Sequence, residues 1–259
     1  MTEMLTLMTQ LSGLGKDVLW VGFLVFLRVG AAMALIPAFG EQAVPQRVKL
    51  VLALAFTAVV APAVSGEVVK LQPGQATPLI TEVLAGLIIG AGFRFFIVAL
   101  QIAGTIIAQA TTLSQLFAGT GPEPQPAIAN LLVMAGLALA VMSGLHLHAA
   151  ELLILSYEPL PAGQFPGAAD IADWGLSQIA RSFSLAFALA APFVAASLIY
   201  NVAIGVINRA MPTLMVSFVG APALALGGLL LLAVVTPLAL SVWSHALDAF
   251  VADPFQVAP

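Results

Sequence analysis

Three arginines carry the charges that most need an explanation, because each lies within or at the end of a long apolar run. Arg28 is the clearest case, since about ten residues on either side place it roughly 15 Å from the nearer membrane surface, beyond the reach of its side chain. A lone arginine facing lipid costs about 2.5 to 3.5 kcal/mol. We therefore expect Arg28 to pair with a carboxylate of another helix, to line an aqueous path or to contact a partner subunit. The candidate carboxylates are those of Glu41, Glu82 and Glu151.

Arg94 and Arg209 raise the same question at other positions. Arg94 interrupts an apolar run near its middle, as Arg28 does. Arg209 follows Asn208 and precedes Pro212, where a helix should stop, so a short charged turn at the membrane surface accounts for it.

The histidines offer little chemistry. His146 and His148 are two residues apart, so on a helix they point to different sides and cannot share a metal ion. His148 and Glu151 share a face, a spacing that suits a proton relay as well as a simple hydrogen bond. The sequence contains no Gly-rich phosphate loop, His-Glu-x-x-His run or Gly-x-Ser-x-Gly elbow. We predict no catalytic residue, no metal site, no cofactor and a protein that is not an enzyme.

The composition points to a membrane. Of 259 residues, 61% are apolar and 8% are charged, against about a quarter charged in an ordinary soluble domain. A net charge of -4 provides no basic surface for nucleic acid, and the absence of cysteine excludes disulfides and thiol chemistry. We predict an all-α integral membrane protein that lies in a lipid bilayer and forms a single membrane domain over residues 1–259.

The elements that must position these residues are apolar runs, since a helix that crosses a bilayer needs roughly 20 apolar residues. Proline, glycine and polar stretches divide the runs into six predicted segments. The first two should form a helical hairpin, the third is too long for one untilted crossing, and the last has prolines and glycines at which it could break. The segments cover residues 18–39, 48–64, 79–108, 127–155, 183–207 and 214–243.

Two stretches between these segments should be irregular, residues 109–126 and residues 158–178. The first ends in three alternating prolines, through which no helix continues. It is either an exposed connector or, because it carries several apolar side chains, a segment buried in protein at membrane depth. Basic residues divide three against three between the two sides, so they do not fix the orientation. Residues 1–17 lack the basic start of a signal peptide, and we expect the first helix to be retained.

Small residues recur four apart, the spacing at which membrane helices pack closely. The pairs are Gly86 and Gly90, Ala99 and Ala103, Ala186 and Ala190, and Ala191 and Ala195.

Three motifs lie in order along the chain and combine arginine, glycine and proline at set spacings. They are Arg28 with Pro37, Gly40, Pro45, Arg47 and Lys49; the loop ending in Phe117 with Gly144-x-His146 and Ser156-x-x-x-Leu160-Pro161; and Gly205-x-x-Asn208-Arg209-x-x-Pro212 with Gly220-x-Pro222. Together they resemble the FliR family of flagellar export-gate proteins, whose virulence-secretion counterpart is called SctT. Two positions differ from the family, Thr213 where it usually has Gln and Gly119-Thr120 where it has Asp-Pro.

The resemblance implies a subunit of a type III protein export gate in the bacterial inner (cytoplasmic) membrane, within the flagellar basal body. Its helices would form hairpins in a cone shared with FliP-like and FliQ-like subunits, next to FlhB-like and FlhA-like export components. Unfolded protein substrates would pass through the channel. The resemblance assigns to assembly or structure Arg28, Pro37, Gly40, Pro45, Arg47, Lys49, Asn208, Arg209 and Pro212. It assigns to a channel plug or gasket Leu113, Leu116, Phe117, Gly119, Gly121 and Pro122.

Two other functions stay open. The first is an injectisome export gate of the SctT type. The second is a proton-coupled solute transporter that uses Arg28, His148 and Glu151. A transporter of that kind is expected to have internal repeats and a binding site at the midplane, and neither is visible in the sequence.

Overall fold

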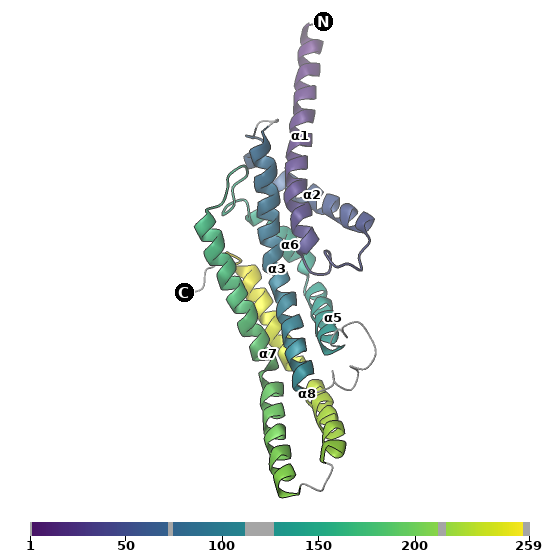
Figure 1. Ribbon diagram of the computed structural model, residues 1–259. Helices are drawn as coiled ribbons and strands as arrows, with labels where there is room; N and C mark the ends of the chain where they lie inside the picture. The colour runs from purple at the N-terminus through teal and green to yellow at the C-terminus, as the bar shows by residue number, and fades with distance from the viewer. Residues whose placement is uncertain (1, 72–74, 112–126, 212–215, 256–259) are drawn as a thin grey trace. The chain divides into compact units, whose positions relative to one another are not determined.

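The computed structural model describes residues 2–71, 75–111, 127–211 and 216–255, and among these residues helices joined by turns and loops are present and no strand is. Five helices are long and apolar enough to cross a membrane, or six spans if the bent pair α5 and α6 counts as one. This confirms the prediction of an all-α membrane protein. The helices, labelled in Figure 1, are α1 (Thr2–Leu35), α2 (Gln46–Val68), α3 (Ala76–Ala110), α5 (Ala127–Met142), α6 (Leu145–Leu155), α7 (Ala168–Ala210) and α8 (Val216–Ala252).

Contacts within the chain group its residues into two compact units. Unit 1 comprises Met1–Arg94, Ser143–Leu176 and Asp253–Pro259, and unit 2 comprises Phe95–Met142 and Ser177–Ala252. Helices α3 and α7 each begin in unit 1 and continue into unit 2. The single membrane domain over residues 1–259 stays a prediction.

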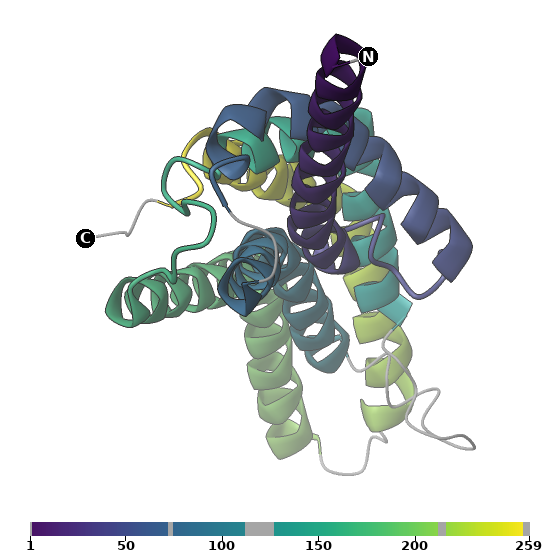
Figure 2. The ribbon, with the colours of Figure 1, turned by 90° about the horizontal axis from the view of Figure 1, so that it is seen from above.

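In unit 1, α2 folds back against α1, so the first two helices form the predicted hairpin (Figures 1 and 2). Two tryptophans tie the ends of this unit together through their indole N–H groups. Trp20 donates to the carbonyl oxygen of Leu71 at 3.0 Å, and Trp174 donates to that of Pro254 at 2.8 Å. These bonds join segments that lie 51 and 80 residues apart in the chain.

In unit 2, α5 packs against α8. The third tryptophan, Trp243, is buried there and donates its indole N–H to the carbonyl oxygen of Phe96 at 2.9 Å. Gly104 allows α3 to approach α5 closely, because a Cβ at this position would overlap the backbone of Ala129. The pairs Ala99 with Ala103 and Ala186 with Ala190 are buried, as their spacing predicts, whereas Ala191 and Ala195 are exposed.

The helix ends differ from the predicted segments in one consistent way, since most helices are longer. Helix α1 begins at Thr2, α2 continues past Pro62 to Val68, and α7 begins at Ala168, inside the stretch predicted to be a loop. Backbone hydrogen bonds continue into polar residues, so apolar composition marks the membrane portion of a helix and not its ends.

A break occurs in the fourth segment and not in the last one, where prolines and glycines offered places for it. The fourth segment, expected to be continuous over residues 127–155, is interrupted at Ser143 and Gly144, because Gly144 adopts a left-handed conformation with φ 84°. The last segment, which carries Pro237, is instead continuous from Val216 to Ala252. Proline removes one helical hydrogen bond, and membrane helices tolerate this loss.

Candidate functional site

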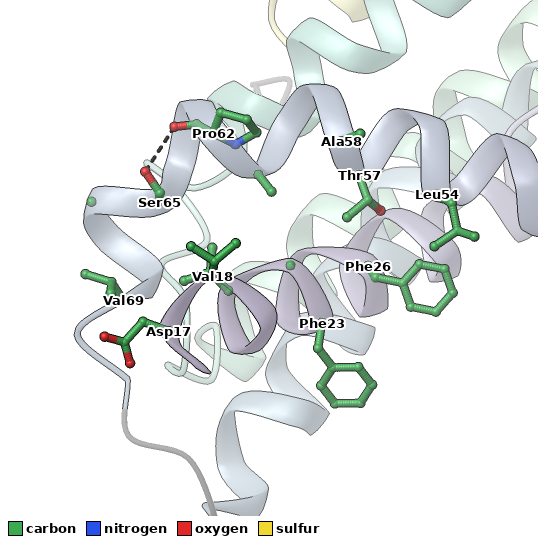
Figure 3. A pocket seen from close by; sticks show the side chains of 14 residues that line it. Asp17, Val18, Phe23, Phe26, Leu54, Thr57, Ala58, Pro62, Ser65 and Val69 are labelled. Carbon is green, nitrogen blue, oxygen red and sulfur yellow. Dashed lines mark hydrogen bonds between the residues drawn. The ribbon is translucent and has the colours of Figure 1, made fainter. Parts of the chain in front are cut away.

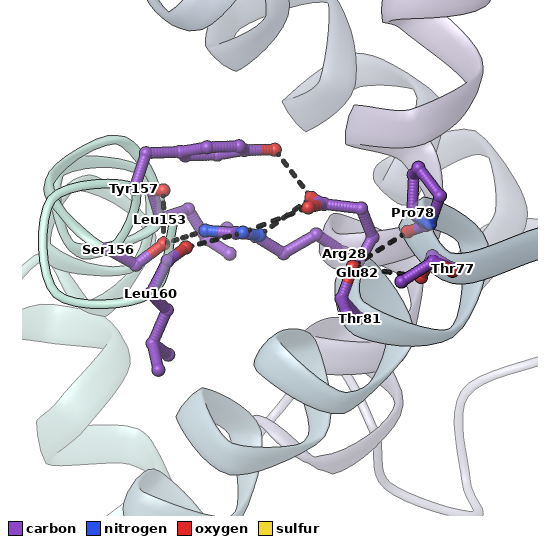
Figure 4. A network of polar contacts seen from close by, with 9 residues as sticks. All are labelled: Arg28, Thr77, Pro78, Thr81, Glu82, Leu153, Ser156, Tyr157 and Leu160. Atoms are coloured by element: carbon purple, nitrogen blue, oxygen red, sulfur yellow. Dashed lines mark hydrogen bonds and ion pairs between the residues drawn. The ribbon is translucent and has the colours of Figure 1, made fainter. Parts of the chain in front are cut away.

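The Arg28 side chain lies at the centre of a buried polar network in unit 1 (Figure 4). Its guanidinium binds both carboxylate oxygens of Glu82, with Nε to Oε2 at 2.8 Å and Nη2 to Oε1 at 3.1 Å. Nη1 donates to the hydroxyl of Ser156 at 3.0 Å, and Nη2 also donates to the carbonyl oxygen of Leu160 at 2.8 Å. The side chains of Arg28 and Glu82 are 1% and 0% exposed. Of the three candidate carboxylates, Glu82 is therefore the partner, and the ion-pair interpretation of Arg28 is correct.

Tyr157 completes the network from the turn that follows α6. Its ring lies against the guanidinium, with Cζ of Arg28 3.5 Å from the ring centroid, the geometry of a cation–π contact. Its hydroxyl donates to Oε2 of Glu82 at 3.1 Å. Burial raises the pKa of Tyr157 well above its usual value, despite the opposing charge of Arg28, so the hydroxyl stays protonated and remains a donor.

Glycines on α3 bring the two charged residues together. Glu82, Gly86 and Gly90 follow one another at four-residue spacing, so they share one face of the helix. A Cβ at Gly86 would overlap the carbonyl oxygen of Arg28, and a Cβ at Gly90 would lie 2.6 Å from that of Ala32. The predicted small-residue pair therefore packs against the turn of α1 that carries Arg28.

The motif residues between α1 and α2 form a second set of contacts in unit 1. Pro37 is buried, and Gly40 donates its N–H to the carbonyl oxygen of Ile36 at 2.8 Å. A Cβ at Gly40 would overlap the backbone of Ala34, so the turn excludes a larger residue there. Pro45 directly precedes the first residue of α2 and accepts hydrogen bonds from the first turn of that helix.

The basic residues of this motif have different surroundings. Nζ of Lys49 donates to the carbonyl oxygen of Gly40 at 2.9 Å, which ties α2 to the preceding turn. Arg94 of α3 pairs with Glu41 at 2.6 Å, and these side chains are 34% and 25% exposed. Arg47 is exposed, with no hydrogen bond or ion pair to the described residues. The motif therefore fixes the connection between α1 and α2.

The remaining predicted site residues are not gathered with Arg28. Asn208 and Arg209 are exposed in the last turn of α7, where the positive charge of Arg209 complements the helix dipole. Pro212 lies outside the described residues, as do all six residues assigned to the plug. Those are Leu113, Leu116, Phe117, Gly119, Gly121 and Pro122.

The relay expected of a transporter does not form. His148 is half-buried and Glu151 is exposed, and within the described residues no hydrogen bond joins them. Arg28 contacts neither of them, because its carboxylate partner is Glu82. Among the residues that the structure describes, no group of three or more His, Cys, Asp or Glu could hold a metal ion.

An apolar groove of about 860 Å³ runs between α1 and α2 (Figure 3). Phe23, Phe26 and Leu54 lie toward one end, and Asp17 and Val69 lie at the other. The lining includes four residues with little or no side chain, which leave room in the groove: Gly22, Ala58, Ala61 and Gly66. Together with the Arg28 network, the groove gives unit 1 a fixed polar interior and an apolar outer face.

The arrangement can hold helices in place, because the polar groups of the Arg28 network bind one another. The donors of Arg28 point at Glu82, Ser156 and Leu160, and the Tyr157 hydroxyl is also bound. A saturated buried ion pair of this kind orients elements and gives little net stability over an apolar replacement.

Sequence reasoning found Arg28 but missed Tyr157 and the use of the Leu160 carbonyl. The available signal was the pair Ser156-Tyr157 directly after an apolar helix, since buried hydroxyls need partners.

Comparison with known proteins identifies a family over nearly the whole chain. The family model described as bacterial export proteins, family 1, matches residues 19–250. The flagellar biosynthetic protein FliR of Caulobacter vibrioides is 38% identical over 221 residues, which cover 83% of this chain and 87% of the relative. The FliR proteins of Escherichia coli and Aquifex aeolicus are 31% and 27% identical, over 83% and 88% of this chain and 84% and 90% of their own lengths. The matched region includes α2, α3 and every residue of the Arg28 network, and the chain belongs to the FliR family of bacterial export proteins.

Proposed function

We propose that this protein is a subunit of the flagellar type III export gate and that it assembles with FliP-like and FliQ-like membrane subunits. The observation that carries the proposal is its membership of the FliR family along nearly all of its membrane helices. The subunits together form the channel through which unfolded export substrates cross the bacterial inner membrane. FlhB-like and FlhA-like components lie next to this gate.

The described residues support a structural role over a catalytic one. The buried charges are fully paired, and the motif residues Gly40, Pro45 and Lys49 hold the connection between α1 and α2. Large apolar side chains are exposed on α1, α2, α7 and α8, which suits helices covered by lipid and by other subunits. In this proposal, Arg28 shapes the surface that meets the neighbouring subunits.

The proposal is tested by deleting the gene and restoring it with a tagged copy. We expect the deletion to abolish swimming and flagellin export, and the tagged protein to co-purify with the FliP-like and FliQ-like subunits. Swimming that persists in the deletion strain, together with loss of secretion through an injectisome, would assign the protein to a virulence gate instead.

Reconstitution of the purified protein separates the gate from a transporter. We expect proteoliposomes that contain this chain alone to show no proton-driven solute uptake. A stable monomer with such uptake would contradict an export-gate role.

A further inference from the structure

The groove between α1 and α2 offers hydrogen-bond acceptors and no free donor. The hydroxyl of Thr57 already donates to the carbonyl oxygen of Ala53, and that of Ser65 donates to the carbonyl oxygen of Pro62. Pro62 has no N–H, so the carbonyl of Ala58, four residues earlier in α2, lacks its helical donor. Ala58 and Pro62 both line the groove and are both exposed.

A carboxylate lies at the end of the same groove. Asp17 is exposed, lines the groove beside Val69, and makes no hydrogen bond or ion pair with the described residues (Figure 3). The charged residues close in sequence to Asp17 and Val69 do not line the groove; they are Lys16, Glu67 and Lys70. The groove therefore presents an apolar surface with Ala58, whose carbonyl lacks its helical donor, partway along it and a negative charge at one end.

These features limit what can fill the groove. A lipid acyl chain matches the apolar walls but cannot donate a hydrogen bond to the Ala58 carbonyl. A cationic lipid headgroup could reach Asp17 at the end of the groove, but Ala58 lies about 16 Å from Val69 along α2 by helix rise. A membrane helix can carry both a donor for the Ala58 carbonyl and a positive charge for Asp17. The small residues of the groove lining allow its backbone to approach; they are Gly22, Ala58, Ala61 and Gly66.

We propose that this groove receives a membrane-spanning helix of another export-gate subunit, which pairs a lysine or arginine with Asp17 and donates from a polar side chain to the Ala58 carbonyl. The two side chains on that helix are about three turns apart, as set by the spacing along α2. This inference rests on the proposed function, because it takes the occupant from the same membrane assembly.

The absence of cysteine from the chain allows a direct test. Ala58→Cys places a single thiol on the groove wall, and Val59→Cys places one on the neighbouring residue, which is 62% exposed and does not line the groove. Each variant is co-expressed with the FliP-like and FliQ-like subunits, labelled with a short photoreactive maleimide and irradiated in the membrane. We expect Ala58→Cys to cross-link to a membrane helix that carries a basic residue about three turns from the linked site, and Val59→Cys to give a different product or none.

Charge variants then test the pairing. We expect Asp17→Asn to lower the yield of the Ala58→Cys product by about two- to fivefold, the range for a partly exposed ion pair. Asp17→Lys should lower the yield further, and changing the partner's basic residue to aspartate should restore it. Glu67→Gln, which removes an exposed acid of α2 outside the groove, should leave the yield unchanged.

The outcomes separate this inference from the proposed function. If the wild-type chain co-purifies with the other subunits but Ala58→Cys links only to lipid or within its own chain, the inference is wrong and the proposed function stands. An unchanged yield in Asp17→Lys, or a linked helix without a basic residue, also overturns it. If no subunit co-purifies with the wild-type chain, both are wrong.

Discussion

At the scale of single residues, Arg28 shows how a charge can lie inside a membrane protein. Its interaction with Glu82 uses two parallel hydrogen bonds, and two further donors reach Ser156 and Leu160. Removing one member leaves the other as an uncompensated buried charge, which costs about 3 to 5 kcal/mol. Arg94 and Glu41 are partly exposed, and pairs of that kind contribute about 0 to 1 kcal/mol.

We therefore expect Arg28→Ala and Glu82→Gln to lower the amount of assembled complex and the swimming rate together, and Arg94→Ala to have a much smaller effect. The double variant Arg28→Met with Glu82→Met should recover assembly better than either single change, because it leaves no unpaired charge. Both expectations, for the single variants and for the double variant, are checked by measuring the amount of co-purified subunits and the swimming rate in soft agar. Normal assembly with lost export in Arg28→Ala would instead place this residue in the channel wall.

The sequence identified Arg28 as needing a partner but could not choose among three acids. Glu82 lies 54 residues away, and Ser156 lies 128 residues away, so the choice depends on how α1, α3 and the turn after α6 pack. Glu41, another candidate, pairs with Arg94 instead. Local spacing carries no information about contacts at such separations, which is why Tyr157 was also missed.

At the scale of helices, the four-residue repeat of Glu82, Gly86 and Gly90 sets the approach of α3 to α1. The repeat places the Glu82 carboxylate and two positions without a side chain on one face of α3. The backbone of α1 lies against these two glycines at Arg28 and Ala32. The charge meets its partner only because the glycines allow the backbones to come close.

We expect Gly86→Ala to destabilise unit 1 strongly, since its added methyl group would overlap the backbone at Arg28. Gly30→Ala on α1 is the matched control, because a Cβ there meets nothing within 4 Å and alanine favours a helix by about 0.8 to 1 kcal/mol over glycine. Thermal unfolding in detergent, followed by circular dichroism, measures both. Equal melting temperatures for the two variants would show that α1 and α3 can separate without loss of the fold.

The helices themselves were largely predictable, because apolar length is a direct requirement of the bilayer. Their ends were not. Prolines and glycines between positions 159 and 167 predicted a loop over residues 158–178, yet α7 begins directly after Gly167, and the acidic Asp170 stabilises its first turn. Gly144 broke the fourth segment while Pro237 left the last one intact, and the sequence alone does not say which of these signals prevails.

At the scale of the whole molecule, helix α7 is longer than a bilayer requires. With 43 residues, α7 extends about 64 Å by helix rise. A hydrocarbon core of about 30 Å, crossed at the largest usual tilt of about 40°, accommodates about 39 Å of helix. A helix of this length therefore exceeds the hydrocarbon thickness even at that tilt.

A prediction at this scale concerns residues 111–122, which we propose as the plug of the resting channel. Glycine, present at 119 and 121, has access to conformations that other residues avoid, and proline, present at 122, 124 and 126, is unfavourable inside a helix. We propose that Leu113, Leu116 and Phe117 form the apolar seal of this plug, held by non-directional contacts that can yield to an entering chain.

Deleting residues 116–121 should leave assembly intact and raise membrane conductance, and Phe117→Ala should do so more weakly. Conductance across planar bilayers that contain the purified complex checks this. An assembled deletion variant with unchanged permeability would return the segment to the role of a connector.

The three tryptophans provide a further use of the architecture, as optical reporters. The chain has three indoles, and each donates to a backbone carbonyl of a distant segment. Indole emission shifts to longer wavelength when the ring meets water, so replacing two of the three with phenylalanine leaves one emitter that reports one junction. Trp20 then reports the junction with Leu71, Trp174 the one with Pro254, and Trp243 the one between α8 and α3. Without any attached dye, fluorescence can show which of these junctions opens first when the protein is heated or when an export substrate arrives.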